Sequence, residues 1–208
     1  MKRRTLDILF SVGGLGLAML LLILGTVMTS NANFAKDYVK DQLSQQNITF
    51  KAASTLTAEE AKSACLTKFA GQLMTTGKQA ECYANEFIGL HVKSVAGGKT
   101  YADLGAPQSD LQATVKAATA SHDPGLADLQ SQLTAITAQR ETLFKGETLR
   151  GLLLTSYGFS VFGDKGSQVA TVAYVVAALL ALLSLAGLVH AVRTAPRVAF
   201  AEPGGHRT

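Results

Sequence analysis

The chain has 208 residues, of which 48% are hydrophobic and 16% are charged, and its formal net charge is +4. This length suffices for one modest domain with its own core, and so large an apolar share argues against intrinsic disorder. The excess positive charge lies in the two tails, residues 1–7 and 193–208, while the rest of the chain is neutral overall. The sequence therefore offers no basic surface for nucleic acid, and we expect no nucleic-acid partner.

Two long apolar runs, residues 8–28 and 169–192, predict transmembrane helices. A helix needs about 20 apolar residues to cross a hydrocarbon core about 30 Å thick, and both runs are long enough. The basic tails that flank the runs predict a plasma-membrane protein with both termini in the cytoplasm, because positive flanks are retained there. The segment between the runs is then extracytoplasmic. A secretory signal is the competing interpretation of the first run, but its apolar core would span only about 7 to 15 residues.

Small residues recur along both predicted spans at the spacing of one helix face. In the first run they are Gly14 and Ala18. In the second run they are Ala173, Ala177, Ala181 and Ser184. Small residues let two helices approach closely in lipid, although alanine is also simply tolerated in a membrane helix. We expect these faces to form helix contacts with partners, and the sequence leaves open which helix each face meets.

Residues 29–147 predict a mostly helical domain, because strong turn breakers are few. The first span is expected to continue as a helix to Gln46, after which β-branched residues favour an extended segment over residues 47–55. A capping box at residues 57–60 predicts the start of another helix, which we expect to end at residues 75–77.

Three further helices are expected in this domain. The first covers residues 79–95 and ends at a pair of glycines, the second covers residues 110–120, and the third begins with Asp123 as N-cap and Pro124 at its first position. The third helix carries a heptad-like pattern formed by Leu126, Leu129, Leu133, Ile136 and Leu143. It needs an apolar neighbour, which either the same domain or another protein supplies.

Residues 148–168 are expected to form an apolar collar at the membrane surface. The large side chains in this segment leave no polar face on a helical wheel, and from residue 157 an extended conformation fits equally well. Lipid headgroups, the domain itself or another subunit must cover such a surface, and aromatic residues beside a span are typical of the membrane interface. We predict partner contacts at Leu152, Leu153, Tyr157, Phe159 and Phe162.

Cys65 and Cys82 both lie in the segment that we expect outside the cytoplasm. In an oxidising compartment, two cysteines without a CxxC motif favour a disulfide over a metal site or a redox motif. A straight helical hairpin turning near Gly77 would place Cys65 too far from the turn. The bridge therefore requires that the first helix end early or bend, and two buried thiols are the alternative.

No group of residues in the sequence predicts catalysis. A mononuclear iron site needs two histidines and a carboxylate, and the expected outer domain holds only His91 and His122, without a ligand spacing. The GGKT sequence at residues 97–100 lacks the earlier glycine and the strand of a phosphate loop, so a helix C-cap is favoured. We therefore expect neither a cofactor nor a bound metal ion.

Two stretches carry a resemblance to a known family: AGQLMTTGKQAECYANEFIGLHVKSVAGGKTYADLGAP and GETLRGLLLTSYGFSVFG. They resemble actinobacterial membrane proteins with two spans and an outward helical domain, which are often named aromatic ring-opening dioxygenases. The family includes an accessory subunit of the respiratory supercomplex that joins a cytochrome bcc unit to a cytochrome c oxidase. The resemblance implies such a subunit, and the two histidines give the dioxygenase name no support.

Three hypotheses for the function follow. The first is a non-catalytic accessory subunit that stabilises a membrane respiratory supercomplex through its spans and collar. The second is a membrane-tethered, metal-dependent dioxygenase whose only external imidazoles are His91 and His122. The third is an envelope protein that binds a lipid or another ligand in its extracytoplasmic domain.

Overall fold

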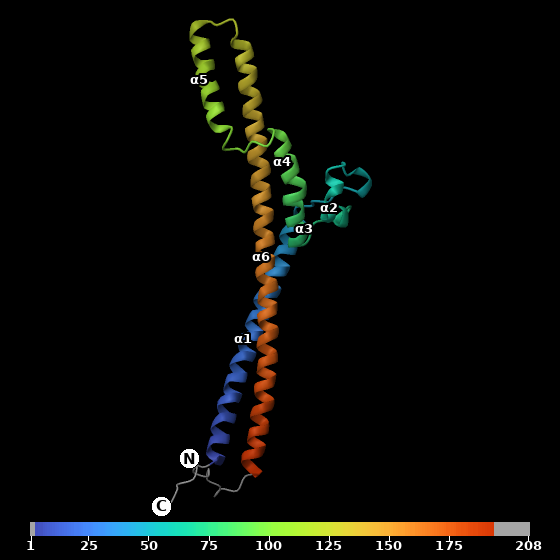
Figure 1. The fold of residues 1–208 in the computed structure, drawn as a ribbon, viewed down its shortest axis with the longest axis vertical. Coiled ribbons are helices and arrows are strands. Elements are labelled where there is room, and N and C mark those ends of the chain that lie inside the picture. Colours follow the sequence, from blue (N-terminus) through green and yellow to red (C-terminus); the bar gives the residue numbers. More distant parts are fainter. Residues whose placement is uncertain (1–2, 194–208) are drawn as a thin grey trace, which may run out of the picture. The chain divides into compact units, whose positions relative to one another are not determined.

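The computed structural model describes residues 3–193, and these residues are almost entirely helical (Figure 1). The two longest helices are α1 (Arg3–Gln45) and α6 (Leu126–Arg193), and both are long and apolar enough to cross a membrane. The expected all-α fold is thus confirmed, as is the continuation of the first apolar run into a longer helix. The parts of the predicted tails at residues 1–2 and 194–208 lie outside the described residues.

The chain divides into two compact units. We call residues 1–35 with 162–208 the two-helix unit, and residues 36–161 the middle unit. Helices α1 and α6 each contribute residues to both units. Because α6 is one uninterrupted helix, the collar at 148–168 is part of that helix and the extended alternative from residue 157 is wrong. A helix satisfies its backbone hydrogen bonds internally, so this segment needs no partner strand for its backbone.

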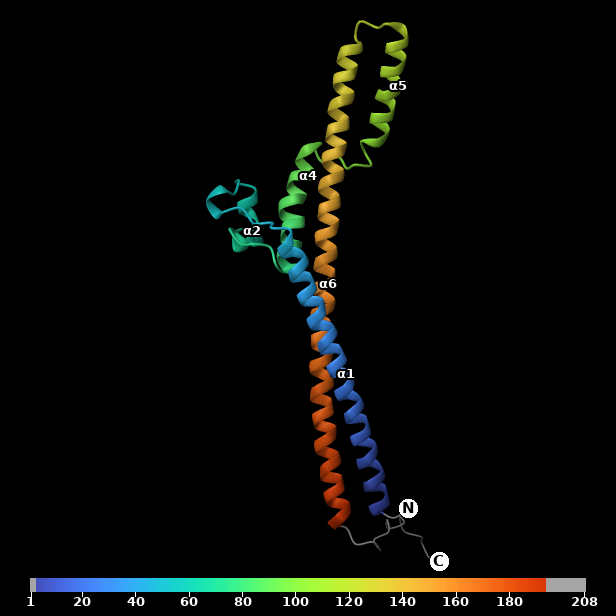
Figure 2. The ribbon, with the colours of Figure 1, turned by 180° about the vertical axis from the view of Figure 1, so that it is seen from behind.

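In the two-helix unit, α1 and α6 lie side by side in both views (Figures 1 and 2). The hydroxyl groups of Thr29 and Tyr174 lie 3.2 Å apart and form a hydrogen bond between the helices. A Cβ placed on Gly25 would lie 2.6 Å from the Tyr174 ring, so the ring packs directly on the glycine backbone. Farther along the pair, His190 Nδ1 lies 3.0 Å from Asp7 Oδ2. These contacts join the two helices at well-separated points.

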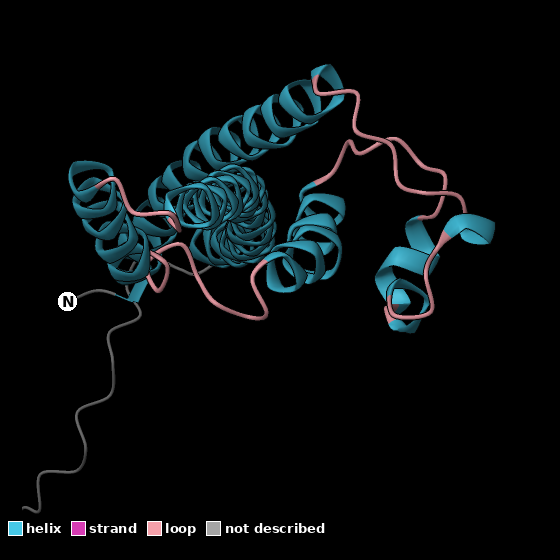
Figure 3. Cartoon of the chain, turned by 90° about the horizontal axis from the view of Figure 1, so that it is seen from above, coloured by secondary structure: helices cyan, strands magenta, loops and turns pink. Residues whose placement is uncertain are grey.

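After α1, the middle unit continues with an extended segment, as expected for residues 47–55, although the last three of these residues form a 3-10 helix. The Phe50 amide donates to the Gln72 carbonyl at 2.9 Å, and the Met74 amide donates to the Ile48 carbonyl at 2.8 Å. A short 3-10 helix, η1 (Ala53–Thr55), follows. Figure 3 shows the described residues as helices joined by loops, without a strand ribbon. The extended pairing is therefore too short to form a sheet.

The capping box expected at residues 57–60 forms, but the helix behind it is short. The Glu60 amide donates to Thr57 Oγ1 at 3.2 Å, and the Thr57 amide donates to Glu60 Oε2 at 2.7 Å. Only a 3-10 turn, η2 (Glu60–Lys62), follows before α2 (Ala64–Phe69) begins with Ser63 as its N-cap. The single long helix expected here is wrong, because a second capping residue starts a new helix after a few residues.

A capping box at Thr76 and Gln79 opens the next helix. The Gln79 amide donates to Thr76 Oγ1 at 3.3 Å, and Gln79 Oε1 accepts from the Thr76 amide at 3.0 Å. The helix runs through α3 (Gly77–Cys82), the π-helical η3 (Tyr83–Ile88) and α4 (Gly89–Val95). The turn at residues 75–77, which was expected to end a helix, therefore starts one. The reason is that the Gln79 side chain accepts a hydrogen bond from the Thr76 amide in front of the helix.

The GGKT sequence ends this helix, as predicted. Gly97 and Gly98 have φ angles of 60° and 87°, in the left-handed region that glycine adopts without strain. The Gly98 amide donates to the Lys93 carbonyl at 2.8 Å, which is a helix C-cap bond. Because the Gly98 amide forms this cap bond, it is not free to bind a phosphate group as an amide of a phosphate loop would.

Helix α5 (Gly105–Ser121) lies beside the first part of α6 in an antiparallel hairpin (Figure 1). It begins earlier than expected, because Pro107 occupies the first turn, where its missing amide costs nothing. His122 ends the helix in the left-handed conformation, with φ 53° and ψ 41°. The predicted break between the two helices is thus confirmed. Gln108 Nε2 donates to Thr137 Oγ1 across the hairpin at 2.8 Å.

The core of the middle unit lies between α1, α6 and the shorter helices. Its largest fully buried apolar side chains are Leu66, Met74 and Leu143. Around them are Val39, Leu43, Phe50, Ala80, Ile88, Val92, Leu104 and Leu153. Residues from α1 and α6 thus share one core with the short helices, which holds these helices against the long pair.

Cys65 and Cys82 form the expected disulfide, with their Cα atoms 6.0 Å apart. Helix α2 ends at Phe69, well before the turn at Thr76. The condition that the first helix must end early is therefore met, and Cys65 reaches Cys82 on α3. The bridge ties α2 to the long helix that follows it.

Candidate functional site

The small residues of the two apolar helices face one another within the chain. A Cβ placed on Gly14 would meet Ser184 Oγ, and one placed on Gly187 would meet Ser11 Oγ. Ala18, Ala173, Ala177 and Ser184 are buried, and Ala181 is half-buried. The faces that we expected at a partner interface are thus covered by each other and need no second protein to bury them.

The predicted interface residues around the start of the second run have different environments. Leu153 is only 3% exposed and belongs to the core, so its assignment to a partner interface is wrong. Tyr157 is half-buried, and its hydroxyl accepts from Lys78 Nζ at 3.3 Å. By contrast, Leu152 is 63% exposed, and Phe159 is 41% exposed. Phe162, in the two-helix unit, is also exposed.

Leu152 and Phe159 line a groove between α1 and α6 in the middle unit, which we call the α1–α6 groove. Its volume is about 330 Å³. The floor consists of the buried side chains of Val39, Leu43 and Leu153. The α1 side is completed by Tyr38, Gln42 and Gln46, and the α6 side by Leu149, Leu152, Thr155, Ser156 and Phe159. Both walls are thus helix faces, and the lining is mostly apolar.

The two aromatic rings of the groove lie at one of its ends. The rings of Tyr38 and Phe159 have centroids 5.8 Å apart and meet edge to face, which is a favourable arrangement for aromatic pairs. Both side chains remain more than a third exposed despite this contact. The pair therefore closes the groove on one side and still presents apolar surface outward.

The polar groups of the groove are all uncharged. Thr155 Oγ1 and Ser156 Oγ each donate to a carbonyl of their own helix, at 2.9 Å and 3.2 Å. Gln42 on α1 and Gln46, directly after the end of α1, make no side-chain hydrogen bond within the described residues 3–193. The free hydrogen-bonding capacity of the groove therefore lies in these two carboxamides.

Sequence reasoning found only the α6 half of this groove. Tyr38 and Gln42 on α1, and Gln46 directly after its end, recur every fourth residue beyond the first apolar run. That period indicates a helix face, but the polar glutamines conceal its role. Only the core that Val39 and Leu43 of α1 share with Leu153 of α6 brings the two halves of the groove together.

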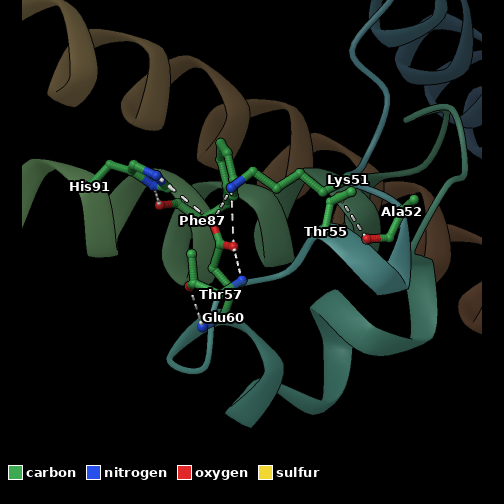
Figure 4. A network of polar contacts seen from close by, with 7 residues as sticks. All are labelled: Lys51, Ala52, Thr55, Thr57, Glu60, Phe87 and His91. Carbon is green, nitrogen blue, oxygen red and sulfur yellow. Dashed lines mark hydrogen bonds and ion pairs between the residues drawn. The ribbon is translucent and has the colours of Figure 1, made fainter.

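A second feature that the sequence missed is the buried carboxylate of Glu60, which is 2% exposed (Figure 4). Lys51 Nζ donates to both carboxylate oxygens, at 2.8 Å and 3.1 Å. The hydrogen bond from Lys51 and then that from the Thr57 amide hold the pKa of Glu60 below its ordinary value. The only sequence signal was the capping box, which predicts the bond to Thr57 and not the burial.

Aromatic side chains surround this ion pair. Lys51 Nζ lies 5.1 Å from the centroid of the Phe87 ring, and the His91 ring stacks on Phe87 with centroids 4.4 Å apart. Burial, and then the charge of Glu60, raise the pKa of Tyr83. Lys51 thus contacts both Glu60 of η2 and Phe87 of the π-helical η3.

Each of the two histidines of the middle unit has a place in the local fold. His91 Nδ1 lies 2.7 Å from the Phe87 carbonyl oxygen, and its Nε2 lies 3.8 Å from Glu60 Oε1. His122 caps α5. Within residues 3–193, no group of three or more histidine, cysteine, aspartate or glutamate side chains is placed to hold a metal ion. Nothing in this part of the chain brings His91 and His122 into one site.

Comparison of the chain with protein-family models, with curated proteins and with solved structures finds no match. The candidate site is therefore defined by geometry alone: an uncharged, mainly apolar groove of about 330 Å³ between two long helices. Such a lining suits an apolar partner or ligand.

Proposed function

We propose that the protein is a non-catalytic accessory subunit, anchored in the plasma membrane by α1 and α6, that contacts larger membrane proteins. The observation that carries this proposal is the exposed apolar surface at Leu149, Leu152 and Phe159 of α6, next to Tyr38 of α1. Large apolar side chains that gather on a protein surface mark interaction sites more often than isolated ones do. Aromatic side chains are also enriched in the centres of protein interfaces.

The disulfide and the charged tails support one orientation in the membrane. Disulfides persist in oxidising compartments, so Cys65 and Cys82 favour an extracytoplasmic middle unit. The basic residues that flank the apolar runs favour cytoplasmic termini. Both signals agree, and we propose that residues 29–147 lie outside the cytoplasm.

The partners that we propose are the cytochrome bcc and cytochrome c oxidase subunits of a respiratory supercomplex. Their support is the resemblance of residues 70–107 and 146–163 to actinobacterial two-span subunits. In this role the protein needs no cofactor of its own. It stabilises the association of the larger subunits by burying its exposed side chains against them.

Purification of the tagged full chain from native membranes in mild detergent tests this function. We expect haem-containing partners to co-purify, visible as cytochrome absorption bands. The double variant Leu152→Ser and Phe159→Ser should lose them. Phe144→Ser is the matched control, because Phe144 is 56% exposed and lies outside the groove. A wild-type chain that purifies alone, without haem, would overturn the proposal.

A further inference from the structure

We propose that the disulfide between Cys65 and Cys82 is a thiol-exchange site, which an extracytoplasmic dithiol oxidoreductase reaches while the middle unit stays folded. Both cysteines line a cleft of about 440 Å³ formed by α2, α3 and η3, which we call the disulfide cleft. One water molecule needs only about 10–15 Å³ of such space, so solvent enters the cleft. Disulfides that solvent reaches are more often exchangeable than bridges buried in a core.

The two cysteines differ in exposure, which selects the sulfur that is attacked. Cys65 on α2 is partly exposed, whereas Cys82 on α3 is only 5% exposed and belongs to the core. The hydroxyl of Ser63 lies 3.5 Å from Cys65 Sγ and is the donor, because a disulfide sulfur carries no proton. A hydrogen bond to sulfur favours the thiolate form, so Cys65 also suits the attacking role when the exchange runs in reverse.

The charges around the bridge do not oppose an incoming thiolate. Lys68 and Lys78 line the cleft together with Glu81 and Glu86, so the formal charges of the lining cancel. Lys78 Nζ pairs with Glu81 Oε2 at 2.9 Å. An anionic sulfur therefore meets no net repulsion at the cleft.

Other contacts hold α2 in place when the bridge opens. Leu66 of α2 is 2% exposed and lies in the core of the middle unit. Backbone hydrogen bonds join the two ends of the segment that contains α2, from the Phe50 amide to the Gln72 carbonyl and from the Met74 amide to the Ile48 carbonyl. Opening of the bridge thus leaves the segment attached to the rest of the unit.

The exchange consists of two balanced steps. A thiolate of the oxidoreductase attacks Cys65 Sγ, the bond to Cys82 breaks, and Cys82 Sγ takes the electron pair and a proton. The second cysteine of the oxidoreductase, as a thiolate, then attacks its neighbour in the mixed disulfide and releases Cys65, which is protonated. The bridge gains two electrons and two protons, and the dithiol becomes a disulfide. The same steps in reverse form the bridge.

This inference rests on the proposed location of the middle unit outside the cytoplasm, because the oxidoreductase must share its compartment. It does not rest on the docking of respiratory subunits. The disulfide cleft and the α1–α6 groove have no lining residue in common.

The experiment traps the mixed disulfide on the oxidised full chain in mild detergent. The probe is a thioredoxin whose second active-site cysteine is replaced by serine, so that it cannot complete the exchange. After acid quenching and alkylation, trypsin cleaves behind Lys68 and Lys78 and places the two cysteines on different peptides. Mass spectrometry should find about ten-fold more probe on Cys65 than on Cys82, in line with their exposure. Probe mainly on Cys82 would overturn the inference.

Urea tests whether the probe reaches the bridge in the folded protein. The trapping rate should stay constant within about two-fold at urea concentrations below the unfolding transition, because attack in the folded state exposes little new surface. A rate that rises steeply with urea, in parallel with the unfolded population, would overturn the inference.

Two variants should cover the bridge from different sides of the cleft, Lys68→Trp from α2 and Glu86→Trp from η3. Each should slow trapping about five-fold, since access limits the exchange. The matched control is Lys62→Trp, because Lys62 is also exposed and close to Cys65 in the sequence but lies outside the lining. Circular dichroism checks that each variant keeps its helical content. Equal rates in all four proteins would overturn the cleft as the route to the bridge.

The same probe, added to spheroplasts, distinguishes this inference from the proposed location. Trapping in detergent but not on spheroplasts would contradict the extracytoplasmic location and, with it, the extracytoplasmic oxidoreductase. Failure to trap in detergent would overturn the exchange site alone and would leave the location and the docking of respiratory subunits standing.

Discussion

Gly14 of α1 lies directly against Ser184 of α6, so that a Cβ on the glycine would meet the serine hydroxyl. The contact repeats with the residue types exchanged, because Gly187 of α6 lies against Ser11 of α1. Each helix thus supplies one glycine and one serine to the pair. A shift of either helix along the other would separate both contacts at once, so the two pairs fix the register of the helices.

The first prediction concerns this register. Gly14→Leu should force the helices apart and lower the stability of the two-helix unit by about 1–3 kcal/mol, as overpacking does in tightly packed interiors. Gly13→Leu is the control, because a Cβ on Gly13 would meet nothing within 4 Å. Thermal unfolding in detergent measures both variants. Equal effects of the two substitutions would show that the packing at Gly14 does not hold the helices together.

Gly77 provides a second test, within the middle unit. A Cβ on Gly77 would lie 2.5 Å from Ser160 Cβ and 3.2 Å from Tyr157 Cα, so Gly77→Ala should lower the unfolding free energy by about 1–3 kcal/mol. Gly158→Ala should instead raise it by about 0.5–1 kcal/mol, because its Cβ meets nothing and alanine favours the helix. Chemical denaturation distinguishes the two. The two changes in unfolding free energy should have opposite signs. Changes of the same sign would contradict the packing of Tyr157 and Ser160 on α3.

The disulfide leads to a third prediction. Cys65 and Cys82 are 17 residues apart, and a bridge that closes a loop of about this length stabilises a fold by about 3 kcal/mol in the chain-entropy model. The double variant Cys65→Ser and Cys82→Ser should lose about that amount, and reduction of the wild-type chain should have the same effect. Denaturation with and without reductant measures it. A reductant effect that persists in the double variant would have another source.

Sequence signals predicted helix ends well where one side chain or glycine decides the local backbone. The glycines after Val95 end α4 as expected, and His122 ends α5 within the predicted break. The same capping chemistry misled at Thr57, where the reciprocal bonds to Glu60 form but Ser63 caps a new helix soon afterwards. A capping box marks where a helix begins and carries no information on its length.

The candidate site was harder to predict, because each helix reveals only its own half. Tyr38 and Phe159 are far apart in the sequence, and only the packing of α1 on α6 brings their rings to 5.8 Å. Periodicity likewise indicates an apolar or small-residue face without identifying what covers it. For that reason the sequence left open which helix meets Gly14, and it placed Leu153 at a partner surface instead of in the core.

The final prediction concerns the pH dependence that Glu60 confers. Its carboxylate is buried and accepts hydrogen bonds from Lys51 and Thr57, which lower its pKa in the folded protein. In the unfolded chain the pKa returns to about 4.3, so the unfolded state binds the proton more readily. The stabilisation is therefore complete above this value and is lost as the pH falls through the folded pKa.

Glu60→Gln should lower the unfolding free energy by about 1–3 kcal/mol at pH 7, since hydrogen bonds to a charged group are replaced by weaker ones. The difference from the wild type should shrink as the pH falls below about 4, because the wild-type carboxyl is then protonated too. Glu59→Gln is the control: its ion pair with Lys62 at 2.6 Å is exposed, so its loss should cost less than about 1 kcal/mol. Thermal unfolding across this pH range measures all three proteins, and a Glu60→Gln difference that does not change with pH would contradict the role of the carboxylate charge.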